Sequence, residues 1–152
     1  MKIHLILFFI TLAVSLTVRA DKENETYFFR TVNYQQGLSN SAVLSIFQDN
    51  EGLMWFGTYD GANCYDGENM EVFRSDFSEQ KTLSNNIVHS IQQADSSCLW
   101  MTTHSGANRF SKDSRQIINN YDFGGDFVIH SNQKGNTWVL GYGWISYYNT
   151  FH

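Results

Sequence analysis

Short stretches in which apolar and polar residues alternate run through the chain from residue 42 onward, separated by clusters of Gly, Asn, Asp and Ser. Alternation with a period of two between such clusters is typical of β-strands. Four strands are predicted in the first part of this region: Ala42 to Gln48, Leu53 to Thr58, Ala62 to Tyr65 and Met70 to Phe77. Turn residues such as Asp49 to Gly52 separate them, so the pattern predicts a four-stranded antiparallel sheet.

The same pattern returns further along the chain. The segment from Leu38 to Tyr65 repeats at Leu83 to Phe110 with a constant offset of 45 residues and no gap. Matched pairs are Val43 and Val88, Ile46 and Ile91, Trp55 and Trp100, Gly61 and Gly106, and Asn63 and Asn108. The second set of strands is predicted at Ile87 to Gln93, Cys98 to Thr103, Ala107 to Phe110 and Gln116 to Tyr121. A period in the low forties with Trp and Gly at fixed offsets is typical of four-stranded propeller blades.

A third and less faithful copy follows, since a shift of 38 residues places Trp100 on Trp138. Its strands are predicted at Phe127 to Ser131, Thr137 to Leu140 and Ile145 to Asn149, with no fourth strand. The segment 27–34, whose Phe29-Arg30 parallels Phe73-Arg74, is predicted as an opening strand. The fold class is therefore all-β: a partial β-propeller, residues 21–152, with blades at 37–77 and 82–121 and an incomplete blade at 127–149. Fewer than three full repeats cannot close a ring, so we expect a piece of a larger propeller.

The N-terminus is typical of a secretory signal peptide. Lys2 precedes an apolar run from Leu5 to Val18, and Val18-Arg19-Ala20 suits a signal peptidase, so residues 1–20 are predicted to be removed after Ala20. The alternative is an uncleaved anchor, but spanning a bilayer takes about 20 apolar residues and this run is shorter. We expect a secreted protein with no membrane contact in the mature chain.

Net charge narrows the range of partners. Removal of the signal leaves 8 Lys and Arg against 15 Asp and Glu, a formal charge of −7 with His neutral. An acidic surface repels phosphate backbones, and no cluster of Lys and Arg offsets it, so nucleic acid is not expected as a partner. Neutral ligands such as oligosaccharides remain compatible with this charge.

Cysteine spacing argues against a metal site. Cys64 and Cys98 lie outside any CxxC or CxxH spacing, so no metal and no cofactor are expected. An oxidising compartment would permit a disulfide between them. We favour two small buried side chains in neighbouring blades, because Cys is commonly buried.

Residues that recur in every blade are expected in the core between blades, and residues that break the repeat are candidates for ligand contact. Trp55, Trp100 and Trp138 belong to the first class. The loop between the second and third strands lies on the same face as the connection between blades. This face is predicted to bind ligand through Tyr59, Asp60, His104, Tyr142 and Trp144.

Catalysis is not expected, and no catalytic residue is predicted. His104 stands in one loop without a second His or a carboxylate at ligand spacing. Asp49, Asp66 and Asp95 sit beside turn residues and are interpreted as turn formers. Ser131 to Trp138 is similar to the Asp-box hairpin of sialidase-type propellers, with Gln133 in place of the Asp, but a glycosidase would need paired carboxylates.

The segment from Gly37 to Gly67, which holds Leu38-Ser39-Asn40 and Asp49-Asn50-Glu51-Gly52-Leu53-Met54-Trp55, closely resembles the two-component regulator propeller repeat. Thr82 to Phe110 looks like its successor, and the resemblance fades in the third copy. This repeat belongs to the extracytoplasmic sensor of hybrid two-component systems, which typically detect oligosaccharides. The resemblance implies a ligand-sensing fragment that lacks the kinase and regulator parts and has no enzymatic activity.

Two other functions stay open. The chain could be a small secreted module that binds carbohydrate or protein and completes its propeller by oligomerisation, through self-association or association with other propeller blades. A propeller lyase or glycosidase is the third alternative, disfavoured because no acid and base pair is identifiable.

Overall fold

The computed structural model describes residues 27–124, 126–132 and 136–149. The predicted signal peptide at 1–20 lies outside these residues. The chain divides after Arg30, and the unit that begins at Thr31 contains every strand described below.

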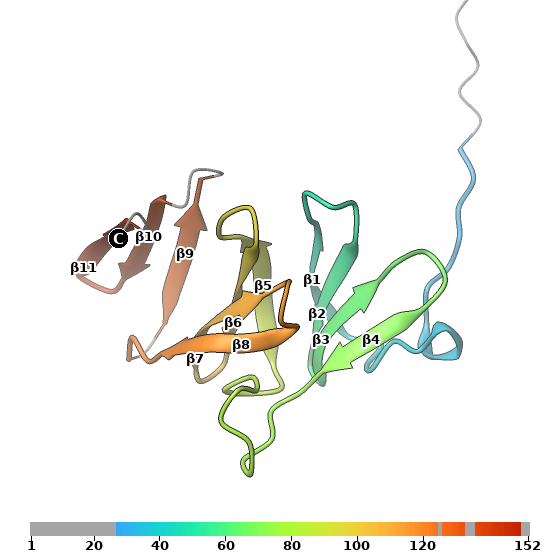
Figure 1. Cartoon of the computed structure of the whole chain (residues 1–152), viewed down its shortest axis with the longest axis horizontal. Coiled ribbons are helices and arrows are strands. Elements are labelled where there is room, and N and C mark those ends of the chain that lie inside the picture. Colours follow the sequence, from blue (N-terminus) through green and yellow to red (C-terminus); the bar gives the residue numbers. More distant parts are fainter. Residues whose placement is uncertain (1–26, 125, 133–135, 150–152) are drawn as a thin grey trace, which may run out of the picture. The chain divides into compact units, whose positions relative to one another are not determined.

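Three antiparallel sheets follow one another along the chain (Figure 1). The first blade comprises β1 (Val43–Gln48), β2 (Met54–Thr58), β3 (Gly61–Tyr65) and β4 (Met70–Phe73), hydrogen-bonded in chain order. The second comprises β5 (Val88–Gln93), β6 (Cys98–Thr103), β7 (Gly106–Ser111) and β8 (Gln116–Tyr121). The third comprises β9 (Phe127–Ser131), β10 (Asn136–Gly141) and β11 (Trp144–Asn149). The predicted fold class, a partial propeller whose sheets do not close into a ring, is confirmed.

Strand register confirms both repeat offsets. Phe47 pairs with Trp55 in the first blade, Gln92 with Trp100 in the second and His130 with Trp138 in the third. The same position therefore holds tryptophan on the second strand of each blade. Local alternation and turn chemistry alone were sufficient to predict this arrangement, because both act between residues close in sequence.

The predicted opening strand over 27–34 is wrong for this chain. Residues 27–33 lie in no strand, and Tyr34–Gln36 forms the 3-10 helix η1. Asn33 caps that helix by accepting a hydrogen bond of 2.7 Å from the Gln35 N–H, and Gly37 ends it with a φ of 93°. Local hydrogen bonds of Asn thus outweigh an extended conformation that no neighbouring strand stabilises in the described residues.

The fourth strand of the first blade is shorter than the predicted 70–77. Its last pair joins Phe73 to Ala62, next to the start of β3 at Gly61. Beyond Phe73 the chain has no partner strand to continue the ladder. Ser75 instead donates its backbone N–H to Oδ1 of Asn86 in the connection to the second blade.

The core lies between the blades. Trp55 of the first blade packs with Val88, Met101 and Phe110 of the second in one buried cluster, with the rings of Trp55 and Phe110 5.3 Å apart. A second cluster joins Trp100 to Ile129 and Val139 of the third blade. The prediction that these tryptophans serve the core is confirmed for Trp55 and Trp100, whereas Trp138 is half-buried.

Two cationic side chains also cross from the second blade to the first. Lys112 is buried, and its Nζ donates to Asn50 and, at 2.6 Å, to Glu51. Arg115 pairs with Glu71 and lies 5.1 Å over the ring of Phe73. These partly exposed hydrogen bonds add polar links between the two blades.

Short polar side chains act in the turns as predicted. Asp49 accepts from the N–H of Glu51, Asp66 from that of Glu68, and Asp95 from that of Ser97.

Cys64 and Cys98 are free and buried, in different core clusters. Burial raises the pKa of both thiols.

Candidate ligand-binding site

The turn between the second and third strands meets the connection between blades, as the sequence predicts. In the first blade the Gly61 N–H donates to the carbonyl of Asn86 at 2.7 Å. In the second blade the His104 N–H donates to the carbonyl of Ile87 at 3.0 Å. The turns that hold Tyr59, Asp60 and His104 are therefore hydrogen-bonded through their backbone to the connection between blades.

Tyr59 and Asp60 occupy this turn in the first blade. Tyr59 is exposed, and the Asp60 carboxylate forms an ion pair of 2.9 Å with Arg74, in which both side chains are exposed. Water screens such a pair, so Asp60 can exchange Arg74 for another hydrogen-bond donor at little cost.

Tyr142 and Trp144 occupy the corresponding turn in the third blade, with different surroundings. Tyr142 is 98% exposed. Trp144 begins β11, pairs with Gly141 and packs partly buried beside Phe123, with ring centroids 6.0 Å apart. Its ring therefore contributes to the core between the second and third blades.

A β-bulge shapes the innermost strand of the first two blades. Register shifts between Val43 and Ser45 in β1 and between Val88 and Ser90 in β5, leaving Leu44 and His89 as the extra residues. A bulge bends its strand and redirects the side chain of the extra residue. His89 is exposed at this point.

The bulge brings His89 beside the predicted ligand residue His104, with their ring centroids 6.1 Å apart. Together they line a cleft of about 420 Å³. The remaining lining residues are Thr102, Thr103, Asp126 and Phe127. Neither imidazole donates or accepts a side-chain hydrogen bond among the contacts of the described residues, so both are available to a ligand.

Sequence reasoning missed His89, Asp126 and Phe127. The sequence does contain a pattern that marks His89 and Phe127. One repeat position holds Leu44, His89 and Phe127, at offsets of 45 and 38 residues. That position varies from blade to blade, while its neighbours Val and Ser recur in the first two blades. The rule that ligand residues break the repeat would have selected it, had the bulge beside it been anticipated.

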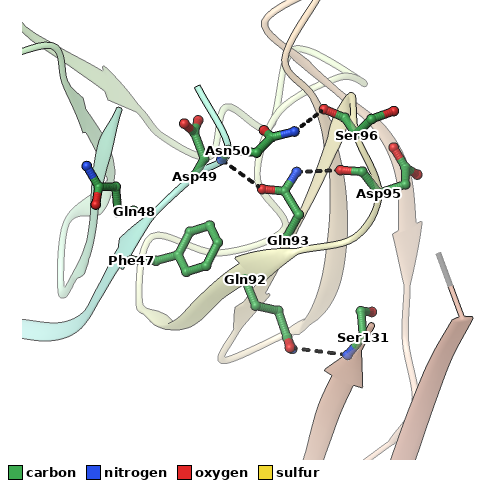
Figure 2. A pocket seen from close by; sticks show the side chains of 9 residues that line it. All are labelled: Phe47, Gln48, Asp49, Asn50, Gln92, Gln93, Asp95, Ser96 and Ser131. Carbon is green, nitrogen blue, oxygen red and sulfur yellow. Dashed lines mark hydrogen bonds between the residues drawn. The ribbon is translucent and has the colours of Figure 1, made fainter. Parts of the chain in front are cut away.

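A second cleft, of about 710 Å³, lies at the turns between first and second strands (Figure 2). The Asn50 side chain donates to the Ser96 carbonyl at 3.1 Å, and the Gln92 side chain donates to the Ile129 carbonyl at 2.6 Å. Gln92 also accepts from the Ser131 N–H, as Figure 2 shows. Because these polar groups join one blade to the next, the cleft with His89 and His104 is the better candidate for ligand binding.

In the described portion of the chain, no helix is long and apolar enough to cross a membrane.

Comparison with known proteins agrees with the fold. Residues 37–60 match the two component regulator propeller family. Over 70 residues the chain is 36% identical to Histidine kinase P4 of Formosa agariphila, which corresponds to 46% of this chain and 5% of that protein. The crystal structure of the extracellular domain of a hybrid two component system from B. thetaiotaomicron superposes with a TM-score of 0.67 at 25% identity.

That superposition covers 80% of this chain and 19% of the solved domain. The chain thus spans a small part of either relative, and its matched segment runs from the turn before β1 to the turn after β2. The resemblance predicted from the sequence is confirmed: residues 37–60 carry a two-component regulator propeller repeat, in a chain similar to the extracellular propeller region of hybrid two-component sensors.

Proposed function

We propose that this chain serves in extracytoplasmic ligand sensing for a hybrid two-component system, and that the cleft at His89 and His104 binds a neutral oligosaccharide. The observation that carries the proposal is the cleft itself, which offers two available imidazoles and the Phe127 ring at the loop end of a sensor-like propeller. Kinase and regulator functions are not assigned to these residues.

Oligosaccharide suits this chemistry for two reasons. Aromatic rings stack on the apolar faces of sugars, and the exposed Tyr59 and Tyr142 occupy the turns of the neighbouring blades that are equivalent in sequence to the turn of His104. Imidazole nitrogens both donate and accept hydrogen bonds, as sugar hydroxyls require. The net charge of −5 for the whole chain disfavours polyanions.

We assign no enzymatic activity to the cleft. Glycoside hydrolysis ordinarily needs two carboxyl groups flanking the scissile bond, and Asp126 is the one carboxylate among the residues that line this cleft. A periplasmic location is part of the proposal, supported by the signal pattern at residues 1–20 and by the similarity to an extracellular domain.

Calorimetric titration with a panel of neutral oligosaccharides tests the proposal. We expect binding in about the millimolar range, since few groups contact the ligand, and its loss in both His89→Ala and His104→Ala. His130→Ala is the matched control, because His130 is exposed on β9 away from the cleft. Binding that both cleft variants retain, or turnover of any oligosaccharide, contradicts the proposal.

A further inference from the structure

We propose that His89 and His104 together bind one divalent transition-metal ion, Zn²⁺, Ni²⁺ or Cu²⁺, with one imidazole nitrogen each. Spacing along the sequence does not suggest such a site, because 15 positions separate the two histidines. The bulge in β5 and the turn after β6 create it. The inference stands on this geometry and does not depend on sugar binding.

The separation of the rings fits a shared ion. A metal to imidazole nitrogen bond is about 2.0–2.1 Å, which puts the ring centre about 3.2 Å from the ion. Two rings on one ion therefore have centres at most about 6.4 Å apart, and about 5 Å apart at a tetrahedral angle. The centroids of His89 and His104 lie 6.1 Å apart, with ring planes at 55°. The observed separation lies below the maximum for a shared ion and above the tetrahedral value.

The backbone holds the two histidines in place. Val88 and Thr103, which immediately precede them, pair across β5 and β6 and are both buried. The His104 N–H also donates to the Ile87 carbonyl at 3.0 Å. Because the backbone of both ligands is fixed before the ion arrives, only side-chain freedom is lost on binding, and this favours affinity.

The ligand types select the class of ion. Imidazole suits Zn²⁺, Cu²⁺ and Ni²⁺, whereas Mg²⁺ and Ca²⁺ prefer oxygen ligands. No group of three or more His, Cys, Asp or Glu side chains within residues 27–124, 126–132 and 136–149 is arranged to hold a metal ion. The proposed site therefore has two protein ligands, and solvent completes the coordination sphere.

The repeat supplies an internal comparison. At the positions of His89 and His104 the first blade has Leu44 and Tyr59, and the third blade has Phe127 and Tyr142. Neither of those pairs offers a nitrogen ligand. The second blade is thus the one of the three whose equivalent positions can bind a metal ion in this way.

Calorimetric titration of ZnCl₂ into the tag-free chain, first treated with a chelator, tests the inference, with NiCl₂, CuCl₂ and MgCl₂ in parallel. We expect His89→Ala and His104→Ala each to weaken Zn²⁺ binding about 100-fold, since the second ligand acts at high effective concentration. The double variant should bind Zn²⁺ at this site more weakly than either single variant, because each single variant keeps one imidazole ligand. His130→Ala should bind as the wild type does.

His104→Tyr, the residue found at this position in the neighbouring blades, gives a second variant suited to the local backbone, and thermal unfolding verifies that each variant folds. Zn²⁺ binding at wild-type affinity in either single variant overturns the proposal. So does equal weakening in His130→Ala, or binding of Mg²⁺ as tight as that of Zn²⁺.

Discussion

The indole Nε1 of Trp55 donates a hydrogen bond of 2.8 Å to Oδ2 of Asp49, and both side chains are buried. The other carboxylate oxygen of Asp49 accepts from the backbone N–H groups of Glu51 and Leu53. One aspartate thus joins the turn after β1 to the core tryptophan of its own blade.

In the second blade the buried tryptophan N–H has a different acceptor. Ala94 occupies the position of Asp49, and the Trp100 Nε1 donates instead to Oγ1 of Thr137 in the third blade, at 3.1 Å. An indole N–H without a partner would be costly in either core. The repeated tryptophan therefore stabilises one blade internally and joins the next two together.

Replacing Asp49 with alanine should lower the free energy of unfolding by about 3 kcal/mol, because the buried Trp55 N–H and two turn N–H groups lose a charged acceptor. Urea unfolding followed by far-UV circular dichroism measures the change. Asp66→Ala is the control, since Asp66 accepts turn N–H groups in an exposed turn and should cost about 1 kcal/mol. Equal losses in the two variants would refute the role assigned to the Trp55 hydrogen bond.

Gly57 marks a close approach of the first two blades. A Cβ at this position would lie 2.7 Å from the Val88 carbonyl oxygen and would also clash with Ser45. Gly57→Ala should destabilise the chain by about 3 kcal/mol through forced separation of the blades. Gly67→Ala, where space is open but φ is 107°, should cost about 1 kcal/mol in backbone strain. Thermal unfolding that ranks these variants in the opposite order would contradict the close packing.

Lowering the pH should reduce the stability of the second blade, because Asp95 becomes protonated. Burial by itself raises the pKa of this carboxyl, but the Ser97 N–H and the Arg109 guanidinium, 2.5 Å away, outweigh burial and lower it. The stabilisation is therefore present above the unfolded-state pKa of about 3.9 and is lost as pH falls through the lower folded-state pKa.

Asp95→Asn should be less stable than the wild type at pH 7, by about 1 to 2 kcal/mol, and the gap should narrow as pH falls below about 4. Urea unfolding at a series of pH values measures the gap. A gap that stays constant from pH 7 to pH 2 would show that the charge of Asp95 contributes nothing.

Exposed sheet faces should make the chain self-associate. Ile46 is 65% exposed, whereas Ile91 at the same repeat position is 5% exposed because the first blade covers it. Leu140 and Ile145, cross-strand neighbours in the third blade, are 56% and 68% exposed. Apolar patches of this kind drive association.

Sedimentation should show concentration-dependent oligomers that bind a hydrophobic dye, and Leu140→Lys with Ile145→Lys should reduce both effects. Ile118→Lys is the control, since Ile118 is exposed on β8 outside these faces. A monomer at every concentration, with a sharp melting transition, would contradict the prediction.

Strand order, turn positions and the core tryptophans of the first two blades follow from the sequence itself. Alternation, turn residues such as Asp49 and Asp66, and the 45-residue repeat all act through local chemistry, which the order of residues specifies directly. For Cys64 and Cys98 the sequence permits a disulfide and favours two buried side chains on the general tendency of Cys, and the structure has both free and buried. The failed strand at 27–34 marks the limit of this reasoning, because strand formation depends on a neighbouring partner.

Only the tertiary structure decided which side chains meet. The bulge at His89 appears only once the pairing of β5 with β6 is known, since it is a property of two strands. The bulge brings His89 beside His104, which in the sequence is a single histidine in its loop. Likewise, the indole N–H of Trp100 finds its acceptor, Thr137, 37 positions away in the third blade. Periodicity determines which face of a strand is apolar, but the packing of one blade on another determines what that face contacts.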